Sequence, residues 1–435
     1  MKRIGLAWAL LALSLLPAAG SALTMEEAVG LARGNNPRLR DFRNRTEAQK
    51  WRVDSRKAPF WPEIDVSYNY ERRENVFSFF QTRDASTFTG EISYNLFRGF
   101  SDLNALQSAR STLDAFLYEQ RTTEADVVLD VKRAWIRLLR AGKTLEVSRE
   151  SVMLLERQSH DAERFWRAGL TAKNEYLKVE VELASARQDL LQAETDVRVA
   201  REALDKAVGA SVGKDAAIED IDFVEPADLD EEALSRAMLS RRSELKFLEA
   251  QRAAREYARD SLRGGYFPSV DLSVEHSRFG ETFAFEGMPD PLFDSDTSAM
   301  VEAKWNLFEG WRTRKEILAE ESEVRAITER HRETRDALLL QLKTAVEEYR
   351  VSAGRIDLAR KSVEQAEENY RITENQYRER VATSTDLLDA RVFLSRARNE
   401  YHNAIYNLSL ARAVLERVVE GPLEMGPPGG ESRGN

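Results

Sequence analysis

The chain of 435 residues repeats itself, and this duplication limits its possible folds more than any other feature. The letters "NLFRGF" at residues 95–100 return as "NLFEGW" at residues 306–311, an offset of 211 residues. The same offset still aligns Leu204 with Leu415, so chance is a poor explanation. Upstream the offset is 206, where "FWPEIDVSYNY" aligns with "YFPSVDLSVEH". We therefore expect two halves with the same order of elements, which differ in the length of a loop between paired strands.

The repeat and the local composition together divide the chain into consecutive segments. Each repeat is expected to contain a helix, a β-hairpin and a long helical hairpin. The predicted segments are a signal peptide over 1–22, a first structural repeat over 23–208, an acidic linker over 209–228, a second structural repeat over 229–420 and a disordered tail over 421–435.

The first residues have the pattern of a secretory signal peptide. Lys2 and Arg3 precede an apolar run, and small residues around Ala22 predict cleavage after that position. The apolar run is too short to span a bilayer, and no later run reaches the eighteen or so apolar residues that a spanning helix needs. We therefore expect the protein to leave the cytoplasm and to cross any membrane with strands.

The composition argues against several classes of function. Charged residues make up 32% of the chain and hydrophobic residues only 42%, a balance typical of long helices with wet surfaces. Cysteine is absent, which excludes disulfides, thiolate metal sites and cysteine nucleophiles, and the four histidines are scattered without metal-site spacing. A net charge of −10 argues against nucleic acid as a partner. With neither a nucleophile and base pair nor a phosphate loop, we expect no enzyme activity, no cofactor and no metal site.

Alternating apolar and polar residues predict two β-hairpins, over 62–97 and 268–308. Their four strands are expected at 62–72, 87–97, 268–278 and 298–308. Each is 11 residues long, close to the ~9–11 that a tilted strand needs to cross a membrane. The alternation also fits a soluble hairpin with one buried face, and the strands alone leave that alternative open.

Heptad spacing predicts two long helical hairpins, over 101–208 and 312–420. Large and small residues alternate along each seam, which lets antiparallel helices approach closely. The first helix of each hairpin would be roughly 100 Å long at about 1.5 Å per residue. The two seams are Leu183, Ala186, Leu190, Ala193, Val197, Ala200 and Leu204, and Leu394, Ala397, Tyr401, Ala404, Leu408, Ala411 and Leu415.

Four strands per chain cannot close a barrel, and an open sheet edge in lipid leaves unpaired backbone groups at several kcal/mol each. If the strands cross a membrane, the chain must therefore oligomerise. Pro62 and Pro268 are expected to open strands. Gly99 and Gly310 are expected to let the backbone turn from strand into helix. Aromatic residues beside these four hinge positions predict a ring at the periplasmic membrane interface.

In these features the chain resembles the TolC-like outer-membrane efflux protein family over nearly all of residues 23–420. The resemblance is carried by residues 23–39, by both NLF-x-G hinges and by the helix-turn segments "RAGLTAKNEYL" and "RVATSTDLLDA". It implies a membrane β-barrel of twelve strands in a homotrimer, continued by an α-helical coiled-coil barrel. The localisation implied is the outer membrane of a Gram-negative bacterium, with extension into the periplasm.

The resemblance also implies partners and an activity. The chain would be a passive, gated export duct of a tripartite efflux or type I secretion system. A periplasmic adaptor, or membrane fusion protein, and an inner-membrane transporter would join it, and outer membrane lipid would surround the barrel. The residues alone also allow an elongated periplasmic coiled-coil scaffold without a pore.

The resemblance places the gate and the docking surface at the helical turns. Asp386 and Asp389 would line the periplasmic entrance as stacked acidic rings, and Tyr377 would tether neighbouring coils with Glu175 as its acidic partner. The residues alone also allow a simpler role for Asp386, as a complement to a helix N-terminus after Thr383. The adaptor would dock on turn residues that include Gly169, Leu170, Val381 and Thr383. Arg380 and Ala382 depart from the family pattern, Arg380 replacing a glycine and Ala382 an arginine.

Overall fold

The computed structural model describes residues 22–75, 83–213, 216–223, 225–280, 282–283 and 294–423. The predicted signal peptide, except for Ala22, and the tail beyond Leu423 lie outside the described residues. The chain forms two compact units. Of the described residues, one unit contains those within 22–42, 121–243 and 335–423, and the other contains those within 43–120 and 244–334.

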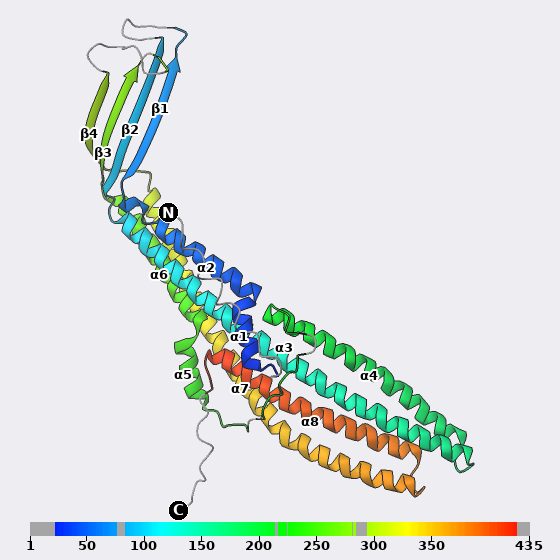
Figure 1. The fold of residues 1–435 in the computed structure, drawn as a ribbon. Helices are drawn as coiled ribbons and strands as arrows, with labels where there is room; N and C mark the ends of the chain where they lie inside the picture. The colour runs from blue at the N-terminus through cyan, green and yellow to red at the C-terminus, as the bar shows by residue number, and fades with distance from the viewer. Residues whose placement is uncertain are drawn as a thin grey trace, which may run out of the picture. The chain divides into compact units, whose positions relative to one another are not determined.

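The second unit contains an antiparallel four-stranded sheet in the order β1-β2-β3-β4 (Figure 1). This confirms the prediction of four strands for the part of the chain that the structure describes. The strands are β1 (Glu63–Arg72), β2 (Asp84–Phe97), β3 (Ser269–Gly280) and β4 (Ser295–Lys304). The prediction of a strand over 298–308 was wrong at its end, because β4 stops at Lys304. β4 lies at the edge of the sheet and has a neighbouring strand only on the side of β3. On its other side no described strand pairs with residues 305–308.

The duplication holds for strand pairing at the level of single residues. β1 and β2 pair Glu63 with Ser93, and β3 and β4 pair Ser269 with Lys304. An offset of 206 converts Glu63 into Ser269, and an offset of 211 converts Ser93 into Lys304. The two hairpins therefore have the same register, which alternation alone does not fix.

Ten helical segments account for most of the remaining described residues, and the two halves have them in the same order. The long helices of the two hairpins match in length, with 67 residues in each first helix and 36 in each second helix. The segments are α1 (Met25–Asn35), α2 (Pro37–Ser55), η1 (Ala58–Phe60), α3 (Ser101–Arg167), α4 (Lys173–Val208), α5 (Glu231–Arg241), α6 (Ser243–Arg263), η2 (Gly264–Tyr266), α7 (Arg312–Arg378) and α8 (Ser384–Val419).

The predicted single helix before each β-hairpin is broken into two. In the first repeat the break lies at Asn36, between the end of α1 and the start of α2. The Asn36 side chain accepts from the Arg38 N–H at 2.9 Å and donates to the Ala207 carbonyl at 2.8 Å. Pro37 opens the next helix, where its missing N–H costs nothing. The break in the second repeat lies at Arg242. Both breaks depend on contacts with distant parts of the chain, which periodicity cannot reveal.

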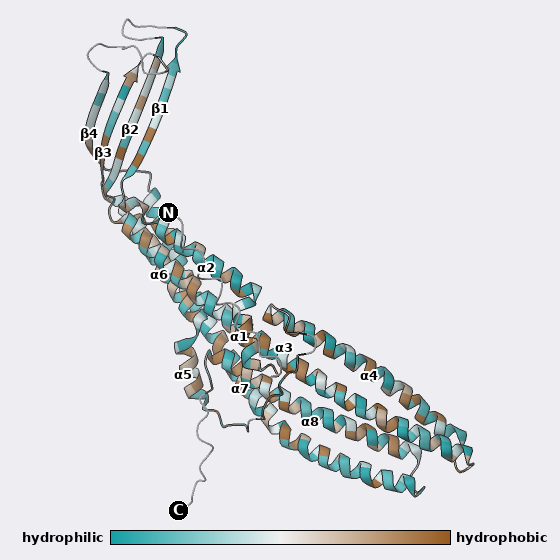
Figure 2. Ribbon diagram, viewed as in Figure 1, coloured by the Kyte–Doolittle hydropathy of each residue, from teal (hydrophilic) through white to brown (hydrophobic). Residues whose placement is uncertain are grey.

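Each helical hairpin buries its own heptad seam. In α4 the seam residues are buried except for the half-buried Leu190 and Val197, and in α8 they are buried except for the half-buried Tyr401. Apolar positions alternate with hydrophilic ones along the four long helices (Figure 2). Among the described residues, no helix is both long enough and apolar enough to cross a membrane.

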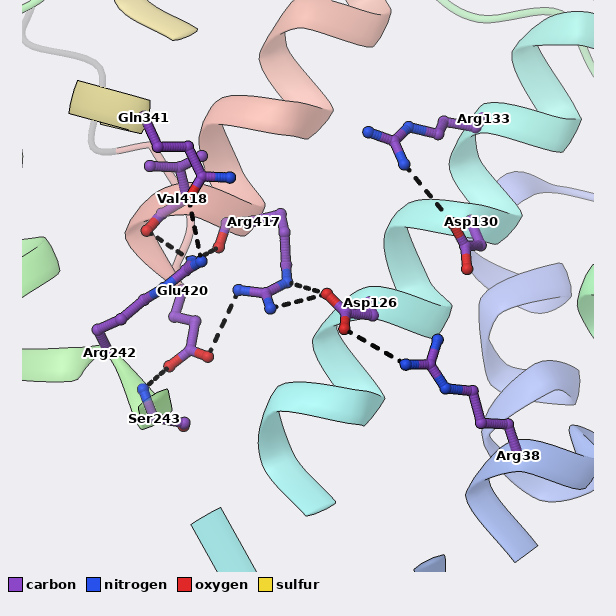
Figure 3. Close-up of polar contacts among 10 residues, drawn as sticks. All are labelled: Arg38, Asp126, Asp130, Arg133, Arg242, Ser243, Gln341, Arg417, Val418 and Glu420. Atoms are coloured by element: carbon purple, nitrogen blue, oxygen red, sulfur yellow. Dashed lines mark hydrogen bonds and ion pairs between the residues drawn. The ribbon is translucent and has the colours of Figure 1, made fainter. Parts of the chain in front are cut away.

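A buried polar cluster fixes the C-terminal end of α8 (Figure 3). Arg242 donates to the Val418 carbonyl at 2.9 Å and also to the Arg417 carbonyl, so it caps two of the carbonyls that a helix end leaves without partners. Arg417 donates to Asp126 of α3 at 2.8 Å, and its side chain is only 8% exposed. The break between α5 and α6 therefore places Arg242 beside the last carbonyls of α8, which need hydrogen-bond donors.

Candidate functional site at the helical turns

The turn between α3 and α4 is a glycine-containing helix ending. Gly169 has φ +69°, in the left-handed region that favours glycine. The Leu170 N–H donates to the Phe165 carbonyl at 2.8 Å, and the Gly169 N–H donates to the Trp166 carbonyl at 2.9 Å. These two bonds form a Schellman motif, which satisfies the last carbonyls of α3.

The turn between α7 and α8 has the same backbone, although it contains arginine where the first turn contains glycine. Arg380 has φ +63°, and the Val381 N–H donates to the Gln376 carbonyl at 2.8 Å. A residue with a Cβ in this region costs roughly 1–2 kcal/mol. The Arg380 guanidinium lies 5.7 Å from the centre of the Phe165 ring on α3, a contact that offsets part of this cost.

The four predicted docking residues fall into two kinds. Gly169 shapes the first turn, and Thr383 is the N-cap residue of α8. Leu170 and Val381 follow the left-handed residues and present apolar side chains to solvent, with Val381 77% exposed. Exposed apolar residues at corresponding points of two turns are suited to binding another protein.

Asp386 has the simpler role that the sequence left open, because it forms a capping box with Thr383. The Thr383 N–H donates to Asp386 Oδ2 at 2.8 Å, and the Asp386 N–H donates to Thr383 Oγ1 at 3.2 Å. Hydrogen bonds from the Thr383 hydroxyl and then its N–H lower the pKa of Asp386. The contact therefore stabilises α8 above the ordinary pKa of aspartate and is lost as the pH falls through the lowered value.

The capping role does not remove the charge that a gate would need. Asp386 and Asp389 lie about one turn apart on α8, and both residues are exposed. Neither carboxylate forms an ion pair within the described residues. Two uncompensated negative charges per chain therefore lie close to the second turn.

Tyr377 and Glu175 are not brought together within one chain. The Tyr377 ring packs near Phe165, with 6.3 Å between ring centres. Glu175 accepts from Lys178 Nζ at 2.9 Å, and the same ammonium lies 3.3 Å from the Thr385 hydroxyl of α8. No hydrogen bond joins Tyr377 to Glu175 among the described residues, so their predicted pairing stays a prediction.

The profile of the family described as outer membrane efflux protein matches residues 28–210 and 234–419. The chain belongs to the outer membrane efflux protein family. The resemblance found in the hinge and turn motifs is therefore confirmed, and with it the function of the family as outer-membrane efflux channels. A comparison with curated protein sequences gave no match.

Solved structures of channel and outer-membrane proteins share the fold. The chain is similar to CmeC of Campylobacter jejuni, with a TM-score of 0.81 and 14% identity over 96% of this chain and 92% of CmeC. It is similar to CusC, with a TM-score of 0.79 and 16% identity over 94% and 96%. It is also similar to VceC of Vibrio cholerae, with a TM-score of 0.78 and 17% identity over 92% and 97%.

Arg391 is a buried charged residue near the turns that the sequence did not single out. Its side chain is 5% exposed and lies among three helices, donating to Ser151 of α3 at 2.6 Å and to Glu182 of α4 at 3.0 Å. It therefore joins the second helical hairpin to the first, less than two turns beyond Asp386. A signal was present, because Arg391 lies three residues before the seam residue Leu394, on nearly the same face of the helix.

We expect Arg391→Met to lower the free energy of unfolding by about 3 kcal/mol, because it leaves the half-buried Glu182 without its cation. Arg398→Met is the matched control on the same helix. Arg398 binds Glu150 and Glu367 near the surface, so its loss should cost about 1 kcal/mol at most. Urea unfolding of both purified variants measures the difference, and equal losses would contradict a special role for Arg391.

Proposed function

We propose that three copies of this chain form a passive, gated export duct of a tripartite efflux or type I secretion system. The duct would cross the outer membrane of a Gram-negative bacterium as a twelve-stranded barrel and extend into the periplasm as a helical tunnel. It would perform no catalytic chemistry and would hold no cofactor. Transport energy would come from an inner-membrane transporter, linked to the duct by a periplasmic adaptor.

The observation that carries this proposal is the sheet with two unpaired edges. β1 and β4 are the outer strands, and every residue of both is exposed in the single chain. The four strands are 10 to 14 residues long, enough to cross a membrane. A membrane sheet with open edges is not stable, so neighbouring copies supply the missing strands.

The first prediction separates this proposal from an elongated periplasmic scaffold. The full-length protein should be extracted from outer membranes by detergent as a trimer that dissociates only on heating. In planar bilayers the trimer should give discrete conductance steps. A soluble monomer in the periplasmic fraction would contradict the proposal and favour the scaffold.

The gate proposed for the duct lies at the turns, where three copies of Asp386 and Asp389 would form two acidic rings. Support comes from their exposure on α8 and from the capping box, which holds the first carboxylate in place. Rings of carboxylates attract cations at a constriction. Tyr377 and Glu175 would act as a latch that tethers neighbouring coils in the closed state.

The second prediction concerns block of the channel by polyvalent cations. Replacing Asp386 and Asp389 with alanine should raise the half-blocking concentration by about tenfold, since each ring loses three charges. Thr383→Ala is the control, because it removes the capping hydroxyl and retains both carboxylates. Planar-bilayer recordings measure the block. An effect of Thr383→Ala as large as that of the double variant would mean that helix capping, and not charge, was being tested.

The adaptor would dock on the turns through Leu170 and Val381. Both side chains are exposed, and they occupy the same place in two copies of one turn motif. Within a trimer this gives six similar apolar points around the tunnel end. Such an arrangement suits the tips of several adaptor chains.

The third prediction is that Leu170→Asp combined with Val381→Asp abolishes recovery of the adaptor after crosslinking in cells and purification of the duct. The apolar pair Leu170→Met and Val381→Ile should retain recovery, because burial of apolar surface drives the contact. Both pairs should leave the trimer intact. Unchanged recovery with the aspartate pair would place the docking surface elsewhere.

A further inference from the structure

The two repeats meet inside the sheet, where β2 of the first repeat pairs with β3 of the second (Figure 1). The register places Asn95 opposite Asp271 and, after a bulge, Phe97 opposite Val270. The Asn95 side chain donates to Asp271 Oδ1 at 2.7 Å. The second repeat thus holds the last residues of β2 in the sheet.

The second repeat also packs closely against the hinge that follows β2. A Cβ added at Gly99 would lie 2.4 Å from the carbonyl oxygen of Gly264 in η2. Gly310 is the counterpart of Gly99 and has nearly the same φ, +67° against +61°. A Cβ added at Gly310 would meet nothing within 4 Å. The first hinge has a packing partner in the chain, and the second hinge has open space.

The residues that follow β4 also lack the packing partner that their counterparts in the first repeat have. Residues 305–308 are the counterparts of residues 94–97, which belong to β2 because β3 pairs with most of them. In the second repeat all four are exposed and outside any strand, with Leu307 78% and Phe308 72% exposed. In the first repeat β3 provides the neighbouring strand for residues 94–97. Among the described residues, no strand of the chain pairs with residues 305–308 in the same way.

The strand that could fill this gap is the counterpart of β3, which is β1. The offsets that convert the β1–β2 register into the β3–β4 register also convert η1 (Ala58–Phe60) into η2 (Gly264–Tyr266), residue for residue. β1 is already paired to β2 on one side, and it lies at the opposite edge of the same sheet from β4. The β1 strand that meets β4 must therefore come from a second copy.

We infer that β4 of one copy pairs antiparallel with β1 of a second copy in the register that the offsets dictate. This inference rests on the proposed assembly and names its contact. Asn306 lies opposite Asp65 of the second copy, and after a bulge Phe308 lies opposite Ile64 of the second copy. Gly310 then lies near Ala58 of the second copy, but less closely than Gly99 lies to Gly264, because a Cβ at position 264 would lie 2.8 Å from the Ser101 Cβ.

The central contact of this interface is a hydrogen bond from the Asn306 amide to the Asp65 carboxylate of the second copy. It repeats the bond between Asn95 and Asp271, with the same residue types in the same roles. Asn306 and Asp65 are exposed in the single chain, and the described residues provide neither side chain with a partner. The apolar side chains of Trp305 and Val66, 60% and 67% exposed, form the adjacent pair.

Cysteine crosslinking of the full-length trimer in outer membranes tests this register, because the natural chain has no cysteine. Asn306→Cys with Asp65→Cys should give covalent dimers and trimers on non-reducing gels, reversed by thiol. Asn306→Cys with Glu63→Cys or with Ser67→Cys shifts the pair by two residues, about 7 Å along the strand. Such shifts exceed the Cα separation that a disulfide bridges, so these pairs should crosslink about tenfold less.

The matched control is Asn95→Cys with Asp271→Cys, which should form the equivalent disulfide within one chain and give no dimer. Stronger crosslinking by a shifted pair would overturn the register and leave the assembly standing. An intact trimer without any crosslink would also overturn it, provided that the control pair had oxidised. Absence of any oligomer would refute the proposed function itself, and the register with it.

A charge exchange gives a second readout that does not depend on thiols. Asn306→Asp places a second carboxylate opposite Asp65 of the neighbouring copy, so the trimer should dissociate at a lower temperature on gels. Adding Asp65→Asn to the same chain reverses the roles of donor and acceptor and should restore the dissociation temperature. Failure of this rescue would show that the two side chains do not meet.

Discussion

The unpaired backbone of two strand edges governs the rest of this structure. A backbone N–H or C=O group exposed to hydrocarbon costs several kcal/mol, and a four-stranded sheet leaves such groups along β1 and β4. The helices satisfy their own backbone groups, so they need no partner for this reason. In the proposed membrane assembly the sheet sets the requirement for several copies, and the helical hairpins would follow the symmetry of the sheet.

The duplication gives this requirement a regular solution. The two β-hairpins have the same register, and the two pairs of long helices have the same lengths, so each chain contains two similar structural repeats. The repeats differ where one half contacts something that the other half does not. Gly264 is replaced by Ala58 in η1, and Gly169 is replaced by Arg380 at the turn. These differences are local and leave the order of the elements unchanged.

Patterns within a short stretch of sequence predicted the fold well. The strand alternation, the heptad seams and the glycines at 99 and 310 report local requirements of the backbone, and each was found in the expected element. The breaks at Asn36 and Arg242 were missed because their hydrogen bonds reach Ala207 and Val418. The end of β4 was missed for a related reason, since a strand is defined by its neighbour as much as by its own residues.

The candidate site was less predictable, because its residues act through partners on other helices. The sequence placed Asp386 in a gate or in a helix cap, and the structure shows the cap without testing the gate. It gave Tyr377 a tethering role, and the structure places that ring against Phe165 in the same chain. Arg391 went unnoticed because its importance comes from burial between Ser151 and Glu182, far away in the sequence.

The position of Arg391 limits how the proposed gate can open. Beyond it toward the turn, the contacts that join the two helical hairpins include the half-exposed Lys178 and the packing of Phe165 against Tyr377 and Arg380. Exposed contacts of this kind contribute little stability, whereas separation of Arg391 from Glu182 leaves charges without partners. The least costly movement therefore separates the turn between α7 and α8 from the turn between α3 and α4. The parts of the helices on the far side of Arg391 from the turns remain packed. Asp386 and Asp389 lie within this short segment, so in the proposed duct a small displacement there would change the distance between the acidic rings and leave the rest of the tunnel packed.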